Sequence, residues 1–187
     1  MTQPRSFSTD LSLDSPRLQL RPMRHADAPA WLTIMADPQV MRYWHHAPWQ
    51  DVAEAESALA QDRQAYADGQ QLKLGMYRRD TGELIGMVQL FNIDEVSRRG
   101  EIGYCLASAV QGRAYMDEAL TCFIDYLAHT LHLRRLEAEI DPRNEGSART
   151  LERQGFVLEG TLRARWCVAG ELSDSGLYGL LMEPPVA

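Results

Sequence analysis

Several features that mark other classes of protein are scarce in this sequence of 187 residues. No stretch approaches the roughly 20 consecutive apolar residues that a membrane-spanning helix needs, and the polar first residues lack the apolar core of a secretion signal. Basic residues number 19 against 26 acidic ones, which gives a net charge of -7, whereas nucleic-acid binding requires a basic patch. We therefore expect a cytoplasmic protein that has neither a membrane nor a nucleic-acid partner.

Cysteine is also rare. The spacing of Cys105, Cys122 and Cys167 suggests neither a disulfide framework nor a metal site. An odd count suits a reducing compartment, so we expect core side chains and no metal ligand. The nucleotide-binding pattern G-x-x-x-x-G-K-S/T is missing as well, which argues against the common phosphate loop of nucleotide-binding proteins.

The most informative stretch of the chain is residues 101–120. Apolar and smaller residues alternate in its first part, as expected for a strand, at Ile102, Tyr104 and Leu106. From about Ala114 the apolar period becomes that of a helix with one buried stripe. The pattern therefore predicts a strand that leads through a short loop into a helix beginning near Arg113.

The loop before this helix has the composition of an anion site. The first N–H groups of a helix have no intrahelical partner, and the helix dipole places partial positive charge there. Gly112 allows close backbone approach, Arg113 adds a cation, and the small Ala114 leaves space for a diphosphate. By itself this pattern also fits an ordinary turn between a strand and a helix.

The sequence around the loop resembles a known motif. Gln111-Gly112-Arg113-Ala114-Tyr115-Met116, followed by Glu118 and Ala119, is similar to the acyl-CoA pyrophosphate loop of the GNAT N-acetyltransferases, Q/R-x-x-G-x-G/A. The branch that includes the Rim-type ribosomal-protein N-acetyltransferases usually has a second glycine where this chain has Ala114.

A second block agrees with the first. Asn144-Glu145-Gly146-Ser147, followed by Leu151 to Phe156, resembles the N-x-x-S and L-x-K/R-x-G-F segments of the same branch. The resemblance extends from about Leu18 to Leu181, and the two motifs occur in the family's order.

The resemblance implies a mixed, mostly antiparallel twisted sheet of about seven strands with helices on both faces. The fourth and fifth strands would run parallel and splay apart to open a cleft. Periodicity predicts strands at 17–21, 72–76, 84–93, 100–106, 133–140, 156–168 and 171–182, and helices at 26–35, 51–69, from 114, and 147–154. Residues 17–187 would form one domain after a flexible arm over residues 1–16.

The resemblance also implies acetyl-CoA as co-substrate and a set of residues that hold it. Main-chain groups of Leu106 and Val110 would bind pantetheine and the start of the phosphate arm, and Asn144 would bind a pantetheine amide. Arg153, or Arg149 on the same helix, would reach a phosphate. The diphosphate would lie against Gln111, Gly112, Arg113, Ala114, Tyr115 and Met116.

Two residues are candidates for the proton transfers. Glu101 matches the acidic residue of the family's E-I-G-Y segment and would act as the base, although a structural carboxylate or a histidine base are open alternatives. Ser147 would protonate the leaving thiolate, although its hydroxyl is also placed to cap a helix. Tyr178 is a second candidate acid.

The acceptor side would be formed by an aromatic segment before the helix at 51–69. It contains Trp44, His45, His46 and Trp49. The tryptophans are also suited to covering the core, and a surface role is common for histidine.

Taken together, the sequence predicts an acetyl-CoA-dependent N-acetyltransferase that acts on a primary amine by direct transfer in a ternary complex. The acceptor would be a protein N-terminus or a small amine. A catalytically silent acyl-CoA-binding module is the alternative, and a homodimer is possible by resemblance.

Overall fold

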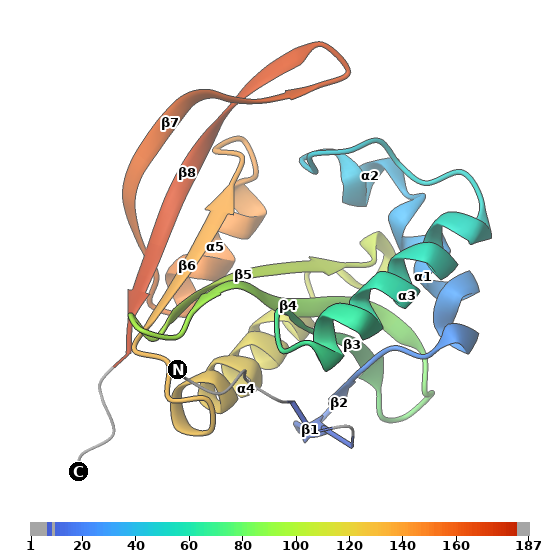
Figure 1. The fold of residues 1–187 in the computed structure, drawn as a ribbon. Helices are drawn as coiled ribbons and strands as arrows, with labels where there is room; N and C mark the ends of the chain where they lie inside the picture. Colours follow the sequence, from blue (N-terminus) through green and yellow to red (C-terminus); the bar gives the residue numbers. More distant parts are fainter. Residues whose placement is uncertain (1–6, 9, 183–187) are drawn as a thin grey trace.

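The computed structural model describes residues 7–8 and 10–182, which build one eight-stranded sheet with the order β1-β2-β3-β4-β5-β6-β8-β7 (Figure 1). All neighbouring strands are antiparallel except β5 and β6, which are parallel. The strands are β1 (Leu13–Asp14), β2 (Leu18–Arg21), β3 (Leu72–Arg78), β4 (Leu84–Asp94), β5 (Arg99–Leu106), β6 (Arg135–Ile140), β7 (Val157–Val168) and β8 (Glu171–Leu181).

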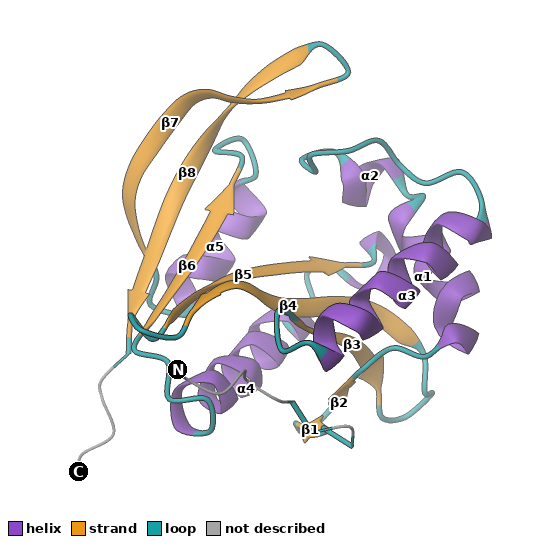
Figure 2. Cartoon of the chain, in the orientation of Figure 1, coloured by secondary structure: helices purple, strands orange, loops and turns teal. Residues whose placement is uncertain are grey.

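Helices cover both faces of the sheet (Figure 2). One face carries α1 (Ala28–Met35), α2 (Pro38–Met41) and α3 (Val52–Ala67), and the other carries α4 (Tyr115–His129) and α5 (Glu145–Arg153). Short 3-10 turns lie at His25–Asp27 and Ser108–Val110. Among the described residues, no helix is long and apolar enough to cross a membrane. The predicted GNAT-like architecture is confirmed.

Alternation and helical periodicity place the main core between the sheet and α4. Every second residue of β2 and β3 is fully buried, at Leu18, Leu20, Leu72, Leu74 and Met76. The stripe predicted for α4 packs against them, with Ala119, Leu120, Phe123 and Leu127 at 0% exposure. A second cluster, which includes Trp31, Leu59 and Met87, lies under α1 and α3. These two cores fix both ends of the strand-loop-helix segment.

The sheet has one strand more than the approximately seven expected from the sequence. The additional strand is β1, whose two residues pair with β2 and fall inside the segment expected to be a flexible arm. Phe7 is buried, and its ring centroid lies 5.2 Å from that of Tyr66 on α3. The described part of the arm therefore packs against the domain, while residues 1–6 and 9 lie outside the described residues.

The parallel strands β5 and β6 separate after a short paired segment. Their register pairs are Arg99 with Arg135, Gly100 with Leu136, and Glu101 with Glu137, and none is formed beyond Glu101. We call this divergence the fork. Because β1 precedes the expected first strand, β5 and β6 are the expected fourth and fifth strands, and the predicted splay is confirmed.

Candidate active site

The loop between β5 and α4 presents a row of free amides. Gly112 and Ala114 have left-handed backbone angles, with φ of 73° and 58°. Among the described residues, the amides of residues 112–117 donate no hydrogen bond, whereas the amide of Glu118 bonds the carbonyl of Ala114. Successive N–H groups with alternating backbone hand form a concave anion site. The loop therefore has the backbone geometry of an anion site.

Two arginines form ion pairs with the two acidic residues in the first turn of α4, Glu118 and Asp117. Arg17 on the edge of the domain bonds Glu118 through its backbone N, at 2.7 Å, and its Nε, at 2.6 Å. Arg153 bonds both carboxylate oxygens of Asp117, at 2.9 and 3.1 Å. Because each carboxylate has a cationic partner, the positive end of the helix dipole is not cancelled at the loop.

Three of the residues predicted to bind the cofactor have buried side chains, so only their main chain is accessible to a ligand. The side chains of Val110, Tyr115 and Met116 are only 7–8% exposed and belong to the core. The guanidinium of Arg17 lies 4.5 Å from the centre of the Tyr115 ring. These contacts hold the backbone of the loop in place while its amides remain free.

The start of the loop is tied to two other elements. The side-chain amide of Gln111 donates to the carbonyl of Leu106 at 3.1 Å, which occupies one main-chain group predicted to bind pantetheine. The hydroxyl of Ser108 donates to the carboxylate of Asp37, the residue that caps α2. The start of the loop is therefore joined directly to α2.

Glu101 lies where the paired part of the fork ends. Its Oε2 accepts a hydrogen bond of 2.9 Å from the side-chain amide of Asn92. Burial raises the pKa of the Glu101 carboxyl, the nearby negative charges of Glu139 and Glu137 act in the same direction, and the Asn92 bond opposes them. A carboxylate with a raised pKa holds a proton more tightly and is a better base near neutral pH.

Ser147 faces Glu101's strand across the fork. Its Oγ lies 2.7 Å from the hydroxyl of Tyr104, which also donates to the Ser147 carbonyl at 3.2 Å. The Oδ1 of Asn144 accepts the Ser147 N–H at 3.1 Å, so Asn144 caps α5 and the helix begins at Glu145, two residues before the predicted start. The Ser147 hydroxyl is consequently not needed as a cap.

Tyr104 and Tyr178 are both buried phenols. Burial raises the pKa of the Tyr104 hydroxyl, so it stays protonated next to Ser147. Tyr178 is 7% exposed in β8, opposite Ala138 of β6, and burial raises its pKa as well. The Ser147 hydroxyl is the one of the two predicted acids that bonds a residue of β5 in this structure.

The three cysteines are free thiols in different surroundings. Burial raises the pKa of Cys105 to about 12, which keeps it a thiol. Cys105 fills the core as expected, but Cys167 is exposed on β7, so that part of the expectation is wrong. Within the described part of the chain, no group of three or more potential metal ligands is present.

The aromatic segment meets the end of β7 on the face of the sheet that carries α1 to α3. The ring centroid of His45 lies 5.6 Å from that of Trp166 and 5.9 Å from that of Trp44. Burial, together with the neighbouring His46, lowers the pKa of His45, which favours its neutral form. His45 thus contacts the hairpin of β7 and β8, and Trp44 packs beside His45.

Trp49 lies on the other side of the segment. Its ring packs edge-on against the buried Trp31, with centroids 6.0 Å apart, and its amide donates to the Met35 carbonyl at 3.1 Å. His46 stacks on Trp49 at 6.2 Å. Trp49 therefore anchors the segment to the core under α1, which was the alternative expected for it.

A cavity of about 910 Å³ lies away from all of these residues. It is bounded by the N-terminal segment, β2, β3 and α3, and its lining includes Phe7, Gln19, Tyr66 and Lys73. None of the predicted site residues lines it. The loop with the free amides and the fork therefore lie outside this cavity.

Sequence reasoning missed several residues that the fold brings to the site. Tyr104 and Glu139 both had a usable signal from strand alternation: Tyr104 shares the face of the buried Ile102, and Glu139 lies on the face opposite the buried Leu136 and Ala138. Arg17 and Trp166 had none, because their partners are 101 and 27 positions away.

Comparisons with known proteins agree with this arrangement. The acetyltransferase (GNAT) domain model matches residues 17–157. The chain is 32% identical over 170 residues to the "Uncharacterized N-acetyltransferase p20" of Bacillus licheniformis, covering 91% of this chain and 96% of that protein. It is 28% identical over 185 residues to the ribosomal protein uS5-alanine N-acetyltransferase of Escherichia coli, covering 94% of this chain and 93% of that protein.

A solved structure extends the agreement to the co-substrate. Mycobacterium smegmatis RimJ in complex with CoA-disulfide superposes with a TM-score of 0.81 at 27% identity, over 91% of this chain and 85% of that chain. The chain belongs to the GNAT family of acetyltransferases and is an acetyl-CoA-dependent N-acetyltransferase.

Proposed function

We propose that the protein transfers an acetyl group directly from acetyl-CoA to a primary amine at the fork, in a ternary complex. The observation that carries this proposal is the row of free amides at residues 112–117. These amides lie in the loop that follows β5, one of the two strands that form the fork. Main-chain groups of Leu106 and Val110 bind the pantetheine arm, and Arg153 shares its charge between Asp117 and a CoA phosphate.

Glu101 is the proposed base. It removes a proton from the acceptor ammonium, the free amine attacks the thioester carbon, and a C–N bond forms as the C–S bond breaks. The raised pKa of Glu101 supports this role, because a base that works near neutral pH needs more than the proton affinity of an ordinary carboxylate.

Ser147 is the proposed acid. Its hydroxyl gives a proton to the departing thiolate and recovers one from the Tyr104 hydroxyl 2.7 Å away. The acetylated nitrogen loses its second proton to solvent, and solvent returns one proton to Tyr104. The proton taken up by Glu101 returns to solvent before the next turnover. Asn144 supports this role because it caps α5 and leaves the Ser147 hydroxyl available.

The proposed acceptors are a protein N-terminus or a small amine. The uS5-alanine N-acetyltransferase relative favours the first class. An N-terminal amine titrates near ~8 and an alkylamine near ~10.4, so the first needs a weaker base. The carboxylates around Glu101 favour any acceptor that arrives as an ammonium ion.

We also propose a homodimer formed through β7. This strand is an edge of the sheet, and it exposes Val157 at 65% and Leu158 at 50%. An unpaired strand with exposed apolar side chains is a template for pairing with a second copy. Sedimentation equilibrium tests this: a dimer that Leu158→Lys dissociates is expected, and a monomeric wild-type protein would contradict it.

The catalytic proposal is tested with Glu101→Gln and Ser147→Ala, using Glu83→Gln and Ser57→Ala on the surface as matched controls. Free-thiol release with an amine panel measures transfer, and titration calorimetry measures acetyl-CoA binding. Loss of a general base or acid lowers the rate by about 10²- to 10⁴-fold, so both site variants should lose transfer while binding acetyl-CoA normally. A wild-type protein that binds acetyl-CoA but acetylates no amine would contradict the proposal.

A further inference from the structure

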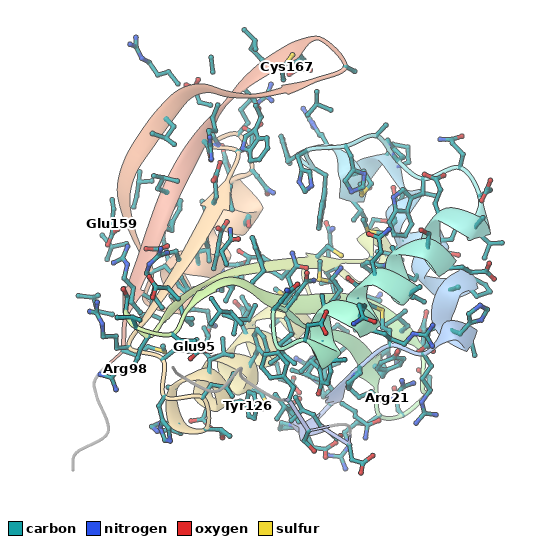
Figure 3. All side chains as sticks on the ribbon, in the orientation of Figure 1. Arg21, Glu95, Arg98, Tyr126, Glu159 and Cys167 are labelled. Atoms are coloured by element: carbon teal, nitrogen blue, oxygen red, sulfur yellow. The ribbon has the colours of Figure 1, made fainter. Side chains whose placement is uncertain are left out.

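The hairpin of β7 and β8 bends over the face of the sheet that carries Glu101. Its register is irregular between Leu162 and Trp166, where Ala164 has a φ of 50° and its amide donates to Asp174 at 2.8 Å. Such a bulge bends a strand and redirects its side chains. The tip of the hairpin, near Cys167, curls towards α2 (Figures 1 and 3).

Because of this bend, Trp166 contacts both β6 and the aromatic segment that precedes α3. Its indole N–H donates to Glu139 Oε1 on β6 at 2.7 Å. Its ring lies against His45 of the aromatic segment, with centroids 5.6 Å apart. The same Oε1 has a longer contact of 3.4 Å with the half-exposed Arg165. Among the described residues, Glu139 Oε2 has no hydrogen-bond partner.

Ser175 lies beneath the hydrogen bond between Trp166 and Glu139, and its hydroxyl has no hydrogen-bond partner among the described residues. The pairing of β8 sets Ser173 opposite Trp166 and Leu177 opposite Glu139, and alternate residues of a strand share a face. Ser175 therefore lies between the two, on the face that Trp166 spans to reach Glu139. It is 0% exposed, and its Oγ bonds no group among the residues the structure describes. A buried hydroxyl without a partner is unfavourable unless a ligand supplies one.

Glu139 is close to the proposed base. Glu137 on β6 pairs with Glu101 on β5, and Glu139 is two residues beyond Glu137, about 6.6 Å along β6 at 3.3 Å per residue. Because neighbouring strands are about 4.8 Å apart, Glu139 lies about 8 Å from Glu101. The negative charge of Glu139 acts on Glu101 directly. Glu137 is occupied by Arg99 and Arg135, each at 2.9 Å, so Glu139 is the carboxylate that keeps a free oxygen.

We propose that Glu139, Ser175 and Trp166 form a subsite that binds a second ammonium group of the acceptor, so that short aliphatic diamines are preferred over monoamines. This inference rests on the proposed transfer at Glu101. The indole N–H now occupies the position on Glu139 that an ammonium N–H takes. An ammonium group is a pure donor, and Glu139 Oε2 and Ser175 Oγ are its acceptors once the indole moves aside to stack on it.

The spacing of the two carboxylates selects the length of the acceptor. An extended chain advances about 3.5 Å for every three bonds, so the five bonds between the nitrogens of 1,4-diaminobutane span about 6 Å. With each nitrogen about 3 Å from its carboxylate, a diamine of this length can bridge the roughly 8 Å between Glu101 and Glu139. Butylamine has the same four carbons and one nitrogen, which makes it the matched comparison.

The experiment compares kcat/KM for 1,4-diaminobutane and butylamine in wild type, Glu139→Gln and the surface control Glu83→Gln. One lost charge-assisted contact corresponds to about tenfold in selectivity. Wild type and the control should therefore prefer the diamine by about tenfold or more, and Glu139→Gln should lose this preference. Equal use of both amines by wild type, or an unchanged preference in Glu139→Gln, would overturn the inference.

A binding measurement separates this inference from the catalytic proposal. Calorimetric titration of 1,4-diaminobutane into the protein with CoA should show binding that Glu139→Gln and Ser175→Ala weaken and Glu83→Gln does not. If the diamine binds in this way but no amine is acetylated, the transfer proposal fails and the subsite stands. If amines are acetylated but Glu139→Gln binds the diamine as tightly as wild type does, the subsite fails and the transfer proposal stands.

Discussion

Replacement of Gly112 by alanine separates the phosphate-binding role of the loop from its contribution to stability. Gly112 has a φ of 73°, and no heavy atom lies within 4 Å of an added Cβ. Gly82, in the turn between β3 and β4, has a φ of 74° and equally open surroundings. A non-glycine residue in the left-handed region costs about 1–2 kcal/mol, so Gly112→Ala and Gly82→Ala should destabilise the protein by similar amounts.

The two variants should differ in acetyl-CoA binding. Alanine at 112 relieves its strain by leaving the left-handed region, which turns at least one neighbouring amide away from the diphosphate. A hydrogen bond to a charged group contributes about 1.5–3 kcal/mol, which corresponds to roughly a tenfold to 150-fold increase in Kd. Gly82→Ala leaves all six amides in place and should bind normally.

Urea unfolding and titration calorimetry on the same preparations measure both quantities. The expected result is an equal loss in the free energy of unfolding and weaker acetyl-CoA binding in Gly112→Ala alone. If Gly112→Ala binds acetyl-CoA as tightly as Gly82→Ala, the amides of residues 112–117 do not hold the diphosphate.

Three further predictions concern the core and the titrating groups. Phe123→Ala removes a fully buried ring and should lower the free energy of unfolding by about 3–5 kcal/mol, measured by urea denaturation; a loss below about 1 kcal/mol would contradict its place in the core. The acid limb of kcat/KM with butylamine should lie above the pH of an ordinary carboxyl and move to lower pH in Glu139→Gln, because Glu139 helps to raise the pKa of Glu101; an unmoved limb would argue against Glu101 as the base. His45 should titrate below an ordinary histidine in an NMR pH series, because its folded pKa is depressed; the neutral ring stabilises the fold above its unfolded pKa, and this is lost as pH falls through the folded pKa. Titration of His45 at or above the ordinary value would show that the ring is not buried.

The sequence predicts the elements of the site better than the contacts between them. Glu101 on β5 and Ser147 on α5 lie on elements that the sequence predicts, because alternation and helical periodicity fix their faces locally. The loop also has its expected place, since Gly112 and the start of the α4 stripe determine where the strand ends and the helix begins. These features depend on neighbours within a few residues.

The features that the sequence does not predict depend on distant partners. Arg17 meets Glu118 only because β2 and α4 pack on the same core, and β1 forms only because β2 offers it an edge. Trp166 reaches Glu139 because of a bulge that has no local signature apart from an alanine with positive φ. Asn144 rather than Ser147 caps α5, which residue type alone does not decide because both can cap.

The most direct test of the account is a crystal structure of the protein with CoA. The diphosphate should accept hydrogen bonds from the amides of residues 112–117, and the thiol should lie in the fork within hydrogen-bonding distance of Ser147 Oγ. A CoA molecule bound elsewhere, or one whose thiol points away from both Ser147 and Glu101, would contradict the central claim that the loop and the fork form one acetyl-transfer site.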